Sequence, residues 1–204
     1  MRMYSSPAPV VRITRMMITN RIFGCGKALK HPLPTPIRPR WVISTCAGRR
    51  TAANLLTWAG WAADEDDAFD IFRVHFKDKP GYVYDALKYY FANYEAGVSA
   101  EMVTVRETRS HMLLDFIVSA VHKGKGAAIK IAHPAKKFGH FLTIYGYGYN
   151  AGEDSFVLYF TDSDDGLHRI RQFKVEWNDA NDRWKTQYLY HDYYLVYALS
   201  LARS

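Results

Sequence analysis

The chain has 204 residues, enough for one domain with a substantial core and few for two. Its composition is 49% hydrophobic and 15% aromatic, which excludes disorder of the whole chain. The formal charge of +7 comes from residues 1–50, which hold ten basic and no acidic residues; the remainder has 17 basic and 20 acidic residues. Nucleic-acid binding needs positive charge fixed on a structured face, so this charge distribution does not favour it.

Residues 1–40 are predicted to be an atypical, disordered leader. They contain six of the eight prolines and show neither a helical nor a strand period. This Arg-rich, acid-poor segment fits a targeting leader, a flexible arm or a stretch translated from a wrong start or frame, and we favour the last two. It lacks the continuous apolar core of a secretory signal. We therefore expect one folded domain over residues 41–204.

Four helices are predicted in the first half of this domain. Apolar residues recur there at intervals of three and four, the spacing of a helix with one buried face. The segments are Thr51–Trp61, Phe69–Phe76, residues 82–94 and Met112–Val121. Asp64–Asp67 is interpreted as an acidic loop between the first two helices.

The second half is predicted to form strands. β-branched and aromatic runs occur between turn residues. They are Ala127–Ala132, Phe141–Tyr149, Phe156–Phe160, Gln172–Trp177 and Tyr193–Leu201. Short Asn- and Asp-rich links predict antiparallel hairpins. Because helices and strands segregate, the predicted class is α+β.

Cys46 is the candidate nucleophile. It precedes the helix predicted over Thr51–Trp61, and the outward N–H groups of a helix N-terminus favour negative charge on sulfur. The same groups can hold the oxyanion that forms when a thiolate attacks a carbonyl. The alternative is a small buried hydrophobe. The other cysteine is Cys25, and two cysteines are too few for a disulfide framework.

His140 and Asp162 are the candidate base and its orienting acid. His140 begins a predicted strand, and Gly139 beside it is expected to leave room for a substrate backbone. Asp162 ends the next strand, and a hairpin would bring it near His140, where it could accept the imidazole N–H. The alternatives are a core histidine and an acidic turn that ends a strand.

Two other motifs are rejected, so no metal and no cofactor is expected. Residues 162–166 resemble a calcium loop, but Gly166 is one position early and Phe173 stands where a bidentate Glu is needed. Residues 24–27 lack the first glycine and the preceding strand of a phosphate loop.

Three further motifs occur in order along the chain: Thr51–Trp58, Gly139–Tyr147 and Leu158–Asp165. Together they resemble the Mac/IdeS-type, immunoglobulin-degrading cysteine endopeptidases, and the similarity runs from about Trp41 to the C-terminus. The resemblance implies a papain-like cysteine peptidase fold, with N-terminal helices packed on an antiparallel C-terminal sheet, that needs no cofactor. It assigns catalysis to the nucleophile Cys46, the general base and acid His140, its orienter Asp162, and Asp164 as a second supporting carboxylate.

The nucleophile region departs from the family pattern. The family cysteine stands seven residues before the asparagine that corresponds to Asn54, and this position is Ala47 here, with Cys46 one place earlier. Arg49 and Arg50 are expected to crowd the thiol, and residues 35–45 offer no lysine for the oxyanion hole. A shifted reading frame over residues 1–50 and a decayed site both remain open.

The predicted function is hydrolysis of peptide bonds in a protein substrate such as immunoglobulin, by a secreted monomer that binds neither membrane nor nucleic acid. Secretion is implied by the resemblance alone. The alternative is a catalytically inactive papain-like protein that binds a host or self protein. A third possibility keeps the same thiolate chemistry but transfers the acyl group to an amine, as transglutaminases do.

Overall fold

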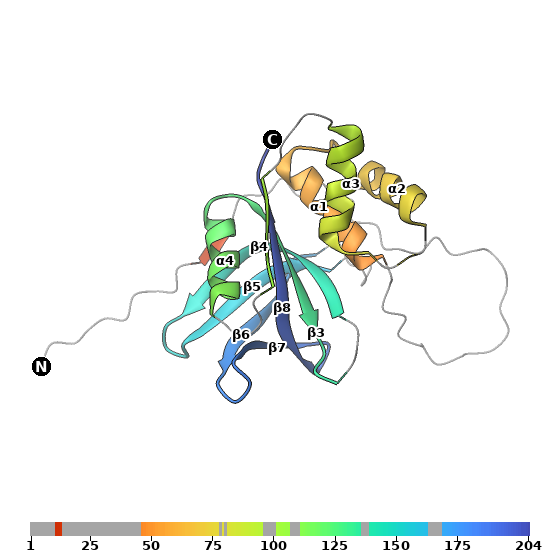
Figure 1. Cartoon of the computed structure of the whole chain (residues 1–204). Coiled ribbons are helices and arrows are strands. Elements are labelled where there is room, and N and C mark those ends of the chain that lie inside the picture. The colour runs from red at the N-terminus through yellow and green to blue at the C-terminus, as the bar shows by residue number, and fades with distance from the viewer. Residues whose placement is uncertain are drawn as a thin grey trace, which may run out of the picture.

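The computed structural model describes residues 11–13, 46–77, 79, 81–95, 101–106, 111–135, 139–162 and 169–204. Within these ranges helices and an antiparallel sheet form an α+β fold, which confirms the predicted class (Figure 1). The predicted leader lies outside the described residues except for the strand β1 (Val11–Ile13), which pairs with the sheet at Gly148 and its neighbours.

The four predicted helices are present among the described residues. They are α1 (Ala47–Ala59), α2 (Glu65–Phe76), α3 (Val83–Tyr94) and α4 (Met112–His122). The interpretation of Asp64–Asp67 as a loop was wrong, because α2 already begins at Glu65. Asp64 is its N-cap and accepts hydrogen bonds from the backbone N–H groups of Asp66 and Asp67.

The remaining strands form one sheet that closes on itself. They are β2 (Met102–Val105), β3 (Gly126–Ala132), β4 (Gly139–Asn150), β5 (Ser155–Thr161), β6 (Arg171–Asn178), β7 (Arg183–Tyr188) and β8 (His191–Leu201). From β3 to β8 each strand pairs antiparallel with the next one, and β8 pairs back with β3. The strand β2 adds to β8. The sequence analysis did not predict β1, β2 or β7.

Two apolar clusters occupy opposite faces of these strands. Ala128 and Phe141 belong to the cluster that includes the buried faces of α1, α2 and α3. Ile129 and Leu142, their neighbours along the chain, belong to the cluster that includes α4. Successive side chains of a strand point to opposite faces, so this alternation places α1–α3 on one face and α4 with the inward side chains on the other.

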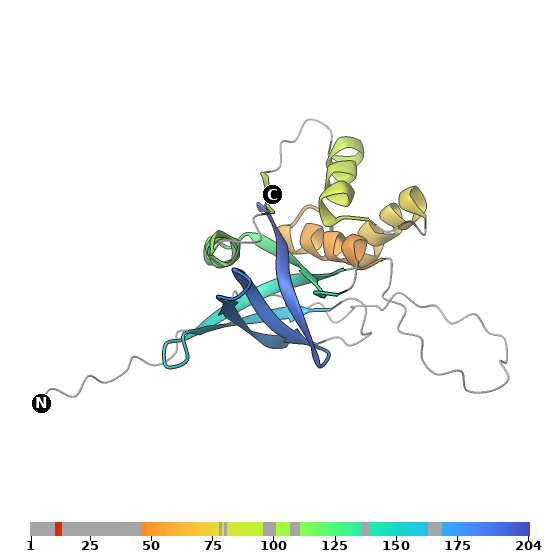
Figure 2. The ribbon, with the colours of Figure 1, turned by 60° about the horizontal axis from the view of Figure 1, so that its bottom comes forward.

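The first turn of α1 lies against the start of β4. A Cβ added at Gly48 would be 2.2 Å from the Gly81 carbonyl oxygen and 3.3 Å from the Phe141 ring. Position 48 therefore admits only glycine without movement of the backbone. Figures 1 and 2 both show the deep orange end of α1 beside the first residues of β4. This contact brings the N-terminus of α1 close to the strand that carries His140.

Candidate active site

The candidate residues that the structure describes on the sheet lie at one end of its strands. Because the strands alternate in direction, the ends of β3, β5 and β7 meet the starts of β4, β6 and β8 there. We call this end of the strands the site edge. His140 is the second residue of β4, Asp162 follows β5, Arg171 begins β6 and Tyr188 ends β7.

His140 and Asp162 form a buried hydrogen bond, as expected from the sequence. The Nε2 atom of His140 lies 2.7 Å from Oδ1 of Asp162, and the two residues are 5% and 2% exposed. A carboxylate only accepts hydrogen bonds, so Nε2–H is the donor. This fixes the tautomer of the neutral ring and makes Nδ1 the nitrogen that can take up a proton.

The second oxygen of Asp162 is held by β6 and β7. The Tyr188 hydroxyl donates a hydrogen bond to Oδ2, and the Arg171 guanidinium lies 3.7 Å from the same oxygen. The Tyr188 ring also stacks on the His140 ring, with 5.7 Å between centroids and 25° between planes. These contacts fix the orientation of the carboxylate and restrict the rotation of the imidazole.

Sequence reasoning missed Tyr188 and Arg171. Arg171 lies one residue before a predicted strand, and Tyr188 ends a strand that was not predicted. The available signal was the inward alternation of Trp184, Thr186 and Tyr188 within a polar segment.

Cys46 is the N-cap residue of α1. The helix begins at Ala47, four residues before the predicted start, so Cys46 stands directly at its N-terminus. Its backbone carbonyl accepts hydrogen bonds from the N–H groups of Arg49 and Arg50, and its half-buried side chain makes no capping hydrogen bond. The thiol therefore lies at the positive end of the helix dipole, where unsatisfied N–H groups can bind an anion.

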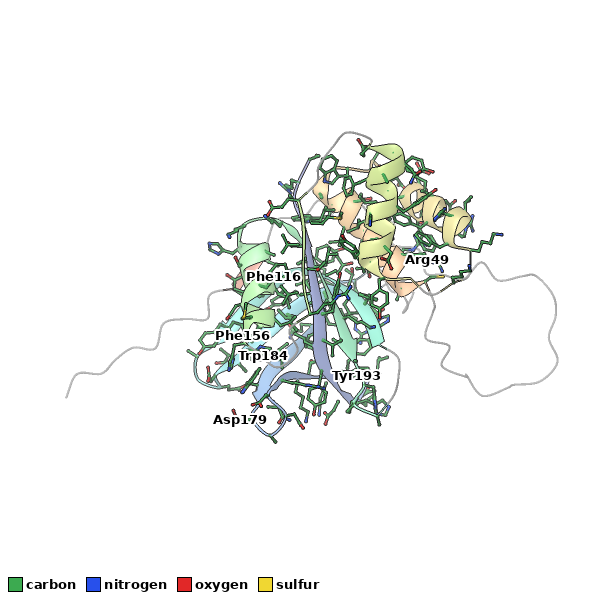
Figure 3. The ribbon with its side chains drawn as sticks, viewed as in Figure 1. Arg49, Phe116, Phe156, Asp179, Trp184 and Tyr193 are labelled. Atoms are coloured by element: carbon green, nitrogen blue, oxygen red, sulfur yellow. The ribbon has the colours of Figure 1, made fainter. Side chains whose placement is uncertain are left out.

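Arg49 and Arg50 differ in their relation to the thiol. The Nη2 atom of Arg49 is 3.8 Å from Sγ of Cys46, and Nη1 donates to the carbonyl oxygen of Lys77. Arg49 is only 1% exposed, so its guanidinium is buried beside the sulfur. Figure 3 labels Arg49 at this end of α1.

Arg50 contacts two residues of α2. Its guanidinium pairs with Asp66 at 2.6 Å and lies over the Phe69 ring at 3.8 Å. The expected crowding of the thiol is seen for Arg49, whereas the contacts of Arg50 are with α2.

The expectation about Gly139 needs correction, and the expectation about Asp164 stays open. The space beside Gly139 is filled by the chain itself, because an added Cβ would lie 2.5 Å from the Ile131 carbonyl oxygen and 2.7 Å from Cε of Lys130. That glycine is required by the β3–β4 pairing, so the expected room for a substrate backbone is absent. Asp164 and Cys25 lie outside the described residues.

Comparison with known proteins leaves the family open. No family model matches the chain, and no curated protein matches it. In the described part of the chain, no helix has the length and apolarity to cross a membrane. The described residues also contain no cluster of three His, Cys, Asp or Glu side chains that could hold a metal ion.

Proposed function

We propose that this chain is a cysteine endopeptidase of papain-like fold, similar to the Mac/IdeS-type enzymes, and that it acts as a secreted monomer on a protein substrate such as immunoglobulin. The observation that supports the proposal is the buried hydrogen bond between His140 Nε2 and Asp162 Oδ1. It leaves the proton-transfer role to Nδ1, and the strand that carries it contacts the helix capped by Cys46.

The proposed first step forms an acyl enzyme. The Cys46 thiol gives its proton to Nδ1 of His140, and the sulfur attacks the carbonyl carbon of the substrate. A C–S bond forms while the carbonyl electron pair moves to oxygen, and the N–H groups at the start of α1 stabilise that oxyanion. The C–N bond then breaks, and the leaving amine takes the proton from Nδ1.

The proposed second step releases the product. Water gives a proton to His140 and attacks the thioester carbon, the C–S bond breaks, and Cys46 recovers its proton. Asp162 holds the imidazole and stabilises its charged form throughout. Arg49 stabilises the thiolate, and Asp164 is assigned a supporting role by the resemblance.

The experiment measures casein hydrolysis and alkylation of Cys46 by iodoacetamide. We expect the native chain to cleave casein and Cys46→Ala and His140→Ala to lose cleavage. His122→Ala is the matched control, since His122 is an exposed histidine that contacts Tyr147 on another part of the sheet. The proposal is wrong if the native chain cleaves neither casein nor immunoglobulin G and its thiol reacts no faster than free cysteine.

A second candidate function is protein binding without catalysis. The position that the family gives to its nucleophile holds Ala47, which is buried in the cluster shared by α1 and Phe141. This observation favours an inactive descendant. That candidate predicts that immunoglobulin G binds the native chain without being cleaved, and that Cys46→Ala binds it with the same Kd in a surface binding assay.

A further inference from the structure

The turn between β7 and β8 is built from residues that do not suit it. Tyr188 and His191 pair across the hairpin, so Leu189 and Tyr190 form a two-residue turn. Their φ angles are 49° and 65°, both in the left-handed region. Such turns strongly prefer Asn-Gly, because a Cβ in this conformation is strained.

Burial does not account for these residues. Tyr190 is 101% exposed and Leu189 is 41% exposed, so a large aromatic and an aliphatic side chain are displayed to solvent at the tip. Strained backbone persists where structure over-determines it, and it concentrates at ligand-binding positions. Two apolar side chains at a strained, exposed turn therefore need a reason outside folding.

The turn lies at the site edge. The residue before it, Tyr188, donates its hydroxyl to Asp162 and stacks on the His140 ring. The residue after it, His191, has its ring 5.9 Å from that of His133, which follows β3. Figure 1 shows the end of β3 and the β7–β8 turn at the same end of the sheet. A chain bound at the imidazole would pass beside the turn.

We propose that Leu189 and Tyr190 bind an aliphatic or aromatic side chain of the polypeptide held at His140 and Cys46, and so select apolar sequences near the reacting bond. This inference rests on the proposed function for the identity of the substrate. It concerns binding, so it can be tested whether or not the site is catalytically active.

The test replaces the turn by its preferred sequence in the double variant Leu189→Asn/Tyr190→Gly, made in a Cys46→Ala background that cannot cleave. Binding of fluorescein-labelled reduced casein, which is unfolded and rich in apolar side chains, is measured by fluorescence polarisation. We expect the Kd to rise by roughly tenfold, the usual scale for losing one apolar contact. A labelled Gly/Ser peptide should show no change. The urea midpoint should rise, because the new turn is unstrained.

Asp182→Gly is the matched control. Asp182 also has a left-handed φ, 49°, and it lies in the β6–β7 turn with Asp179, which Figure 3 shows at the opposite end of the strands from Tyr193. This variant should gain stability and bind casein as before.

Several outcomes would overturn the inference. They are an unchanged casein Kd in the turn variant, an equal loss of casein binding in Asp182→Gly, and no casein binding in the parent. A concentration-dependent dimer that disappears in the turn variant would instead make the turn a contact between copies of the chain. If the native chain does not cleave casein but the binding results are as expected, the proposed catalysis is contradicted and the binding role of the turn still stands.

Discussion

Substitution of Gly48 by alanine tests the contact that positions Cys46. The added Cβ would lie 2.2 Å from the Gly81 carbonyl oxygen, whereas real Cβ atoms essentially never approach closer than 3.0 Å, so α1 and Gly81 must separate by about 0.8 Å. Overpacking costs about 1–3 kcal/mol, and about 2–3 kcal/mol applies here because the clash is with a backbone carbonyl and not with a flexible side chain. Alanine regains about 1 kcal/mol of helix propensity. The expected net loss of unfolding free energy is about 1–2 kcal/mol.

Urea denaturation followed by circular dichroism measures this loss. With a slope of about 2 kcal/mol per molar urea, the midpoint should fall by roughly 0.5–1 M. The matched control is Gly152→Ala, where the nearest atom to the new Cβ is 3.5 Å away in an exposed turn. The same shift moves Cys46. A displacement of this size in a catalytic group can lower the reaction rate by up to about 10²-fold. A Gly48→Ala variant as stable as the native chain would refute the close packing of α1.

Three more predictions concern buried polar groups. Asp162→Asn removes the acceptor charge at His140 and should lower kcat for casein by about 10³–10⁴-fold, while Asp192→Asn, at a half-buried carboxylate that pairs with Lys185, leaves it unchanged. Tyr188→Phe keeps the stacked ring but removes the hydroxyl donor, so kcat should fall with little change in KM, and the unfolding free energy from urea denaturation should fall by about 1–3 kcal/mol. Burial raises the pKa of Tyr145 to about 12. The unfolded chain therefore loses this proton first, so Tyr145 should contribute a fall in stability of roughly 1.4 kcal/mol per pH unit between pH 10 and pH 12, and Tyr145→Phe should remove that share of the decline in urea titrations.

Local patterns predicted the helices well but missed the first turns of α1 and α2. Periodic apolar residues mark the buried face, and they located all four helices that the described residues contain. The first turn of α1 carries Arg49 and Arg50, which break the apolar pattern although both side chains are buried by partners distant in sequence. In α2 the first turn was taken for a loop because it contains only acidic residues, and the first apolar residue of the helix is Ala68.

The pair at the centre of the site was predictable, and its supports were not. His140 and Asp162 belong to consecutive strands, so a single hairpin brings them together. Tyr188 and Arg171 reach the same carboxylate only after β6 and β7 have continued the sheet. Pairing across several strands depends on register and closure, which short sequence patterns do not encode.

The two halves of the proposed site belong to different apolar clusters, and one strand joins them. His140 is held through Asp162 and Tyr188, whose neighbours are the inward side chains of the closed sheet. Cys46 packs with the helical cluster on the other face. Phe141 is the link, because it follows His140 on β4 and its ring contacts the first turn of α1 at position 48. Since protein interiors are close-packed, this contact between helix and strand helps to set the relative position of thiol and imidazole.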